Sequence, residues 1–125
     1  PWVEPALEQA DWLLPIPLSA QRLRERGYNQ ALLLARQLDA GKTRADWLLR
    51  VQDTPLQHSL KRAERLHALD HALALAPHGL PHLQGRRVVL IDDVMTTGAT
   101  LHAAARVLRA AGAAHITGLV MARTE

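Results

Sequence analysis

Two adjacent carboxylates, Asp92 and Asp93, directly follow the apolar run from Val88 to Ile91. An apolar run without polar alternation is typical of a strand that is buried on both faces of a parallel sheet. Open α/β sheets bind their ligands at the carboxyl ends of such strands. The sequence therefore predicts that both carboxylates lie at a ligand-binding edge.

Small and hydroxyl-bearing residues follow the acidic pair and lead into a helical pattern: Thr96, Thr97, Gly98, Ala99 and Thr100. Backbone N–H groups at a helix N-terminus, together with short hydroxyls, form a phosphate site. The carboxylates would repel a phosphate, so they need ribose hydroxyls or a hydrated Mg²⁺ as partners. A phosphate beside vicinal hydroxyls describes a ribose 5-phosphate. The alternative is that these residues only cap a turn and a helix.

Apolar runs of strand length alternate with amphipathic helical patterns along the chain. The predicted strands are Asp11 to Pro17, Ala45 to Val51, Val88 to Ile91 and Ile116 to Met121, and the predicted helices span 31–38, 66–76 and 101–111. This alternation predicts an α/β fold, a parallel sheet flanked by helices. We expect a polar loop after the first strand and another loop from Pro77 to Gly85. The two ends, 1–10 and 123–125, are expected to be peripheral.

The bulk composition limits the classes of function. At 125 residues the chain has room for one domain with a hydrophobic core, so we expect a single domain over residues 1–125. With no cysteine, a disulfide framework, a thiolate metal site and a cysteine nucleophile are excluded. We see neither a membrane span nor a signal peptide, which predicts a soluble, unexported protein. A formal charge of +3 does not by itself imply nucleic acid. The chain starts at Pro1, which leaves a processed or fragmentary sequence open.

The segment VVLIDDVMTTGAT, residues 88–100, resembles the signature of type I phosphoribosyltransferases, whose substrate is 5-phosphoribosyl 1-pyrophosphate (PRPP). By that resemblance Asp92 and Asp93 hold the ribose hydroxyls, while residues 96–100 wrap the 5-phosphate. PRPP would carry Mg²⁺, so no protein cage for the metal is implied.

A second segment narrows the resemblance. PIPLSAQRLRERGYNQALLLARQL, residues 15–38, is similar to the ComF/GntX group, in which a proline-rich strand precedes RGxNQ. With the pattern of Gln57, Leu60 and Arg65, the resemblance extends over nearly the whole chain. It implies a type I phosphoribosyltransferase-like fold and a cytoplasmic bacterial protein linked to competence and DNA uptake.

The resemblance also suggests which side chains meet the diphosphate. The candidates in the pyrophosphate loop are Arg22, Arg24 and Arg26, and the candidates in a lid are Gln57, Lys61, Arg62 and Arg65. Solvated surface positions explain the same residues as an alternative. Ala68 and Leu73 depart from the usual Asn and Phe of the group. The cysteine-rich zinc module common at the family's N-terminus is absent, so no zinc is expected.

Two classes of function follow. The first is an enzyme that transfers a phosphoribosyl group with Mg²⁺ and releases pyrophosphate. The second is a non-catalytic module that binds a phosphoribosyl ligand or single-stranded DNA in the DNA-uptake machinery. Three Trp, one Tyr and no Phe argue against a base-stacking surface. The histidine pairs His67/His71 and His78/His82 lack a third metal ligand, so we expect surface histidines. Neither the acceptor base nor the oligomeric state is predicted.

Overall fold

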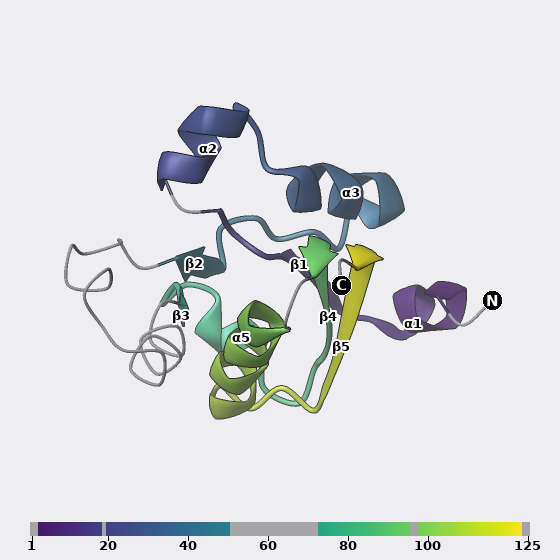
Figure 1. Cartoon of the computed structure of the whole chain (residues 1–125). Coiled ribbons are helices and arrows are strands. Elements are labelled where there is room, and N and C mark those ends of the chain that lie inside the picture. The colour runs from purple at the N-terminus through teal and green to yellow at the C-terminus, as the bar shows by residue number, and fades with distance from the viewer. Residues whose placement is uncertain (1–2, 19, 51–72, 96–97, 124–125) are drawn as a thin grey trace.

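A three-stranded parallel sheet with helices on both faces forms the body of the molecule (Figure 1). The computed structural model describes residues 3–18, 20–50, 73–95 and 98–123. The strand order is β1-β4-β5, with β1 at Trp12–Pro15, β4 at Arg87–Met95 and β5 at His115–Arg123. Helices α1 (Val3–Gln9) and α3 (Gln30–Asp39) lie on one face, and α5 (Ala99–Ala110) lies on the other. The predicted parallel sheet flanked by helices is confirmed.

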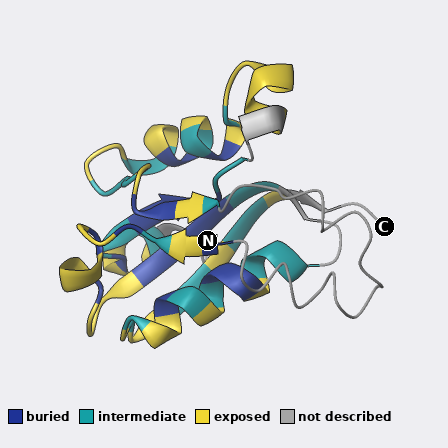
Figure 2. Cartoon of the chain, turned by 90° about the vertical axis from the view of Figure 1, so that its left-hand side faces the viewer, coloured by how far each residue is buried: buried dark blue, intermediate teal, exposed yellow. Residues whose placement is uncertain are grey.

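Strand β4 is buried on both faces, as its apolar run predicted. Val88 and Leu90 pack in the cluster that contains Leu108 of α5. Val89 and Ile91 pack in the cluster that contains the alanines of α3. Successive side chains of a strand point to opposite faces, so one apolar run serves both layers. Figure 2 shows the buried residues concentrated in the strands and on the helix sides that face them.

A separate two-stranded antiparallel sheet joins β2 (Leu48–Arg50) to β3 (Leu73–Leu75). Of the predicted strand from Ala45 to Val51, the described residues form a strand over β2, and Val51 lies outside the described part. The predicted helix over 66–76 is wrong at its C-terminal end, because residues 73–75 form β3. Leu73 is buried and the following Ala74 is exposed, an alternation that suits a strand paired on one edge. The rest of that predicted helix lies outside the described residues.

Helix α2 (Ala20–Arg26) occupies the position for which the sequence predicted a basic loop. The prediction was wrong because its basis was polarity, whereas Ala, Gln, Arg, Leu and Glu are all good helix formers. Gly27 then takes φ +82°, and its N–H donates to the Leu23 carbonyl at 2.7 Å. A glycine in the left-handed region is a common helix stop.

The N-terminal segment packs more closely than expected. Ala10 is buried in the cluster beneath α3, and Leu7 of α1 packs against that cluster. The Lys42 ammonium donates to the carbonyls of Leu7 and Glu8 at 2.9 and 3.2 Å. The predicted loop before β4 contains a 3₁₀ turn, η2, at Leu80–His82. Within the described ranges, no helix combines the length and apolar character that a bilayer crossing requires.

Candidate functional site

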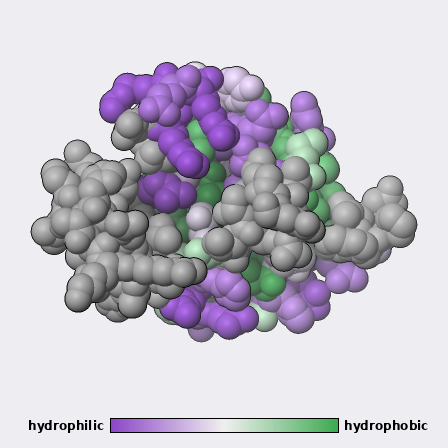
Figure 3. Space-filling view, in the orientation of Figure 1, coloured by the Kyte–Doolittle hydropathy of each residue, from purple (hydrophilic) through white to green (hydrophobic). Residues whose placement is uncertain are grey.

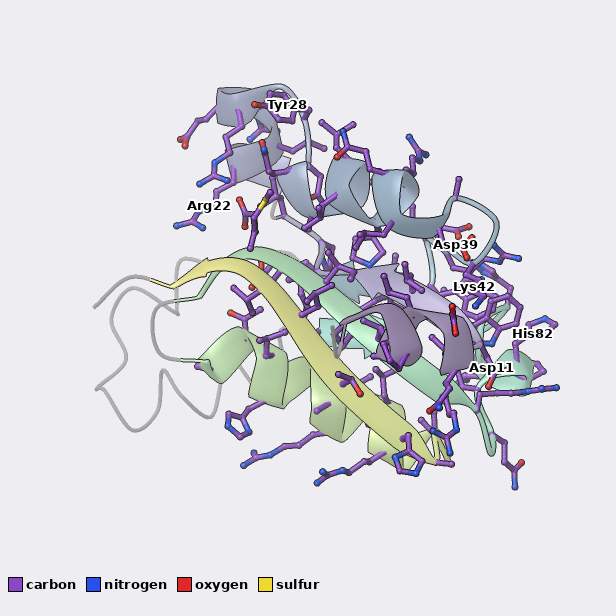
Figure 4. The ribbon with its side chains drawn as sticks, turned by 90° about the vertical axis from the view of Figure 1, so that its right-hand side faces the viewer. Asp11, Arg22, Tyr28, Asp39, Lys42 and His82 are labelled. Carbon is purple, nitrogen blue, oxygen red and sulfur yellow. The ribbon has the colours of Figure 1, made fainter. Side chains whose placement is uncertain are left out.

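A cavity of about 310 Å³ lies where β1 and β4 end, beside the start of α5. It is lined by Ile16, Pro17, Leu18, Arg22, Arg26, Arg50, Asp92, Asp93 and Thr100. Three stretches of the chain that are distant in sequence, residues 16–26, 50 and 92–100, therefore meet at one edge. Figure 4 shows Arg22 of α2 near the carboxyl ends of the strands, whereas Asp11 and His82 lie at the opposite end of the sheet. Figure 3 shows hydrophilic side chains gathered over α2.

The RGYNQ segment, residues 26–30, connects α2 to α3 beside this cavity. Arg26 ends α2, Gly27 turns the chain, and Asn29 caps α3. The Asn29 side-chain oxygen accepts from the N–H groups of Ala31 and Leu32 at 3.0 and 3.4 Å. Its amide nitrogen donates to the Ile16 carbonyl at 3.1 Å. One side chain therefore starts α3 and ties it to the end of β1, where the cavity wall begins.

Arg26 forms an ion pair with Asp93, with 3.0 Å between guanidinium and carboxylate. The Arg26 side chain is 47% exposed and that of Asp93 is 18% exposed. A partly desolvated pair of this kind is less screened than a surface pair. The structure therefore places one predicted arginine directly on one predicted carboxylate.

Asp92 lies beside Asp93 and accepts a hydrogen bond from its backbone N–H at 3.0 Å. The pKa of Asp92 is raised to about 6, mainly by burial; a hydrogen bond with the Asp93 side chain and the negative charge of Asp93 act in the same direction, and the bond from the Asp93 backbone N–H acts against it. The nearby Arg50 acts in the opposite sense on this pKa. The ionised form of a half-buried carboxyl next to a second carboxylate is stabilised by hydroxyl donors or by a cation.

Arg50 is a cavity residue that the sequence analysis missed. Its Nε donates to the Pro17 carbonyl at 2.9 Å, so it links the end of β2 to the segment after β1. The available signal was a charge at the end of an apolar run, just before the predicted lid. That signal was weak, because the pairing that brings β2 to this edge is not local in sequence.

The predicted phosphate loop is only partly described. Gly98 has φ +80° and forms the N-cap of α5, of which Ala99 is the first residue. Thr100 lines the cavity, so the helix N-terminus faces it. Positive φ at Gly98 agrees with the reason for expecting glycine there. Thr96 and Thr97 lie outside the described residues.

The remaining candidates divide into two sets. Arg24 lies on α2 but is not among the residues that line the cavity, unlike Arg22 and Arg26. The predicted lid residues lie outside the described part of the chain: Gln57, Lys61, Arg62 and Arg65. Within the described part, no group of three or more His, Cys, Asp or Glu side chains could hold a metal ion. The carboxylates of Asp92 and Asp93 offer the oxygen ligands that a hydrated Mg²⁺ would need.

An aromatic cluster lies away from the cavity. The Trp12 and Trp47 rings pack edge to face at 4.8 Å, and the His82 ring stacks on Trp47 at 5.3 Å. The Arg44 guanidinium lies 4.6 Å from the Trp12 ring centre. Trp47 is buried, so these two tryptophans pack within the fold and do not form an open surface for nucleobases.

Comparison with known proteins gives a family match, two similar relatives and one similar solved structure. The phosphoribosyl transferase domain family matches residues 24–124. Competence protein ComFC of Bacillus subtilis (strain 168) is 41% identical over 113 residues, which cover 90% of this chain and 44% of ComFC. DNA utilization protein YhgH of Escherichia coli O6:H1 is 34% identical over 121 residues, which cover 94% of this chain and 52% of YhgH. A solved structure of the allosteric regulatory enzyme of purine biosynthesis aligns with 93% of this chain and 24% of its own, at 19% identity and TM-score 0.49.

The family match includes every segment that lines the cavity except the end of β1 and the first part of α2. The chain spans about half the length of the two curated relatives. The alignments with both relatives cover at least nine-tenths of this chain. The chain therefore belongs to the phosphoribosyl transferase domain family and, within it, to the ComF family.

Proposed function

We propose that this protein binds PRPP in the cavity at the strand ends and transfers its phosphoribosyl group to an acceptor, with release of pyrophosphate. One observation carries the proposal: two adjacent carboxylates and three arginines line the same cavity at the start of a helix. PRPP has the complementary chemistry, since it combines vicinal hydroxyls with a 5-phosphate and a diphosphate. The family match supports the same ligand class.

Each part of the ligand has a chemically suited partner in the proposal. The carboxylates of Asp92 and Asp93 accept hydrogen bonds from the ribose hydroxyls. The 5-phosphate lies at the N-terminus of α5, near Thr100, where backbone N–H groups and the helix dipole favour an anion. Arg22 and Arg50 face the diphosphate, because one guanidinium group can donate two parallel hydrogen bonds to phosphate oxygens.

The proposed reaction needs no protein nucleophile. The bond between C1 of the ribose and the diphosphate oxygen breaks, and the bonding electrons leave with the diphosphate. Arginine side chains stabilise the departing negative charge, while the acidic pair lies near the positive charge that develops on the sugar. Mg²⁺, when bound, supplies further neutralisation of the diphosphate. The acceptor nucleophile then forms the new bond at C1.

Residues beyond the described part enter the proposal by resemblance alone. Thr96 and Thr97 would complete the 5-phosphate loop. The lid would consist of Gln57, Lys61, Arg62 and Arg65, closing over the ligand and excluding water. The printed names of the relatives, a competence protein and a DNA utilization protein, lead us to propose a cytoplasmic role with the DNA-uptake machinery.

A product assay tests this function. The purified protein is incubated with PRPP, Mg²⁺ and each common nucleobase in turn, and released pyrophosphate is measured while nucleotides are identified by mass spectrometry. Base-dependent pyrophosphate release with a matching nucleotide supports transfer. Binding of PRPP without turnover of any base would contradict transfer and favour the non-catalytic ligand-binding role. Absence of both binding and turnover would contradict the proposal as a whole.

A further inference from the structure

Arg26 lines a cavity that holds both carboxylates and arginines, and it contacts one of the carboxylates. Its guanidinium contacts the Asp93 carboxylate at 3.0 Å, and it lines the same cavity as Arg22 and Arg50. Guanidinium groups that share a cavity repel one another, and a carboxylate in contact with one of them offsets part of that repulsion. Asp93 is in such contact with Arg26.

We propose that Arg26 is an exchangeable internal counterion: it holds Asp93 when the cavity is empty of ligand, and it transfers to the diphosphate when the ligand enters, which releases Asp93 for a hydroxyl or a cation. This inference rests on the proposed function and adds a coupling between the two halves of the site. Arg26 acts as a positioning residue in this scheme.

The competition between Arg26 and a cation for the acidic pair is inferred from the charges of the two carboxylates and from the ligands that cations prefer. Asp92 and Asp93 are adjacent, and hard divalent cations prefer carboxylate oxygens. A guanidinium on Asp93 cancels one of the two negative charges and occupies one carboxylate oxygen. Arg26 therefore competes with free divalent cations, so that the acidic pair binds a cation well only after the guanidinium has moved.

The transfer of Arg26 to the diphosphate is inferred from the position of Arg26 and from its exposure. Arg26 is the last residue of α2, and the residue that follows it is Gly27, a residue type with a wider range of backbone conformations than others. About half of the Arg26 side chain is exposed, which leaves it room to change partner. A diphosphate offers more negative charge and more acceptor oxygens than one carboxylate, so the guanidinium gains contacts when it transfers.

Titration with Mn²⁺ alone tests whether Arg26 competes with cations for the acidic pair. The electron paramagnetic resonance signal of the free ion measures how much Mn²⁺ stays unbound. The Arg26→Gln variant is expected to bind Mn²⁺ roughly fivefold more tightly than the wild type, since partly exposed ion pairs compete on this scale. Arg24→Gln is the matched control, because it removes the same charge from the same helix outside the cavity. Its affinity for Mn²⁺ should equal that of the wild type.

A second substitution guards against an indirect effect. In the Arg26→Gln background, Asp93→Asn should abolish the gained Mn²⁺ affinity, and circular dichroism verifies that each variant is folded. Equal Mn²⁺ affinity in Arg26→Gln and Arg24→Gln would overturn the inference. Failure of Arg26→Gln to bind Mn²⁺ measurably would overturn it equally.

Titration with pyrophosphate in the presence of EDTA tests the transfer of Arg26 to the diphosphate. Asp93→Asn frees the guanidinium and should tighten pyrophosphate binding about threefold or more, whereas Arg26→Gln should weaken it. Asp92→Asn removes a neighbouring carboxylate that does not contact Arg26, so a smaller gain is expected there. Equal gains in the two Asn variants would show a general charge effect and would contradict an exchange.

The two arms separate this inference from the proposed function. If the wild type binds PRPP but Arg26→Gln leaves Mn²⁺ binding unchanged, the exchange fails while PRPP binding stands. If the wild type does not bind PRPP but both arms give the expected shifts, the counterion exchange stands and the assigned ligand is wrong.

Discussion

Asp92 shows how the site shapes the stability of the fold. Its pKa is raised from 3.8 to about 6, mainly by burial, so the folded state disfavours its ionised form. As pH rises from about 4 to about 6, the unfolded chain ionises this group more readily than the folded protein. The free energy of unfolding therefore falls as Asp92 ionises over this range, and it does not recover at higher pH.

Replacement of Asp92 by Asn should raise the midpoint of thermal unfolding at pH 8, because the half-buried negative charge beside Asp93 is removed. The Asn side-chain oxygen still accepts from the Asp93 backbone N–H. The gain should shrink as pH falls and approach zero near pH 4. Differential scanning calorimetry across this range measures it, and a pH-independent gain would contradict the charge origin.

At the residue scale the sequence predicted which side chains line the cavity better than it predicted their contacts. Asp92, Asp93 and Thr100 were predicted, and all three line the cavity. The Arg26 pairing with Asp93 was not predicted, since 67 positions separate the two residues. Arg50 was missed for the same reason: its partner is the Pro17 carbonyl on a different segment.

At the element scale, Asn29 connects a helix to the site. Replacement of Asn29 by Ala removes the cap of α3 and the bond to the Ile16 carbonyl. The free energy of unfolding should fall by about 1–2 kcal/mol. Asn29→Ser retains a capping oxygen but not the donor to Ile16, so it should recover roughly half of the loss. Urea unfolding measures both variants, and an equal loss in the two would indicate that the cap contributes nothing.

The two elements that the sequence mispredicted have different physical causes. Polarity indicated a loop around Arg24, yet helix propensity and the stop at Gly27 produced α2. A three- and four-residue spacing indicated a helix through Leu73, yet pairing with β2 made that end a strand. In β3, a tertiary contact outweighed a local pattern, as is common for short segments. The long periodic helices α3 and α5 were predicted correctly.

At the scale of the whole molecule, the two core layers hold the strand ends in place. Leu108 of α5 is fully buried, whereas Leu33 of α3 is 43% exposed. Leu108→Ala should lower the free energy of unfolding by roughly 2–5 kcal/mol, because it leaves a cavity between α5 and the sheet. Leu33→Ala, the control in another helix, should change it by less than about 0.5 kcal/mol. Similar losses in chemical denaturation would contradict the described packing.

The order of the parallel strands explains why the site follows from the fold. Parallel strands present their carboxyl ends at one edge, so alternating strands and helices predicted where β1 and β4 would bring their loops together. The sequence could not predict the separate β2–β3 sheet, because antiparallel pairing of short segments depends on contacts distant in the chain. The cavity needs that sheet, since Arg50 reaches it from β2.

The most direct test of the central claim is calorimetric titration of the protein with PRPP, with and without Mg²⁺, in the wild type and in the variant carrying both Asp92→Asn and Asp93→Asn. Ribose 5-phosphate and pyrophosphate serve as ligand controls. We predict saturable binding of PRPP that Mg²⁺ strengthens, and a loss of at least about tenfold in affinity in the double variant, because two charged acceptors are removed. Equal affinity of the wild type and the folded double variant for PRPP would contradict the assignment of the site.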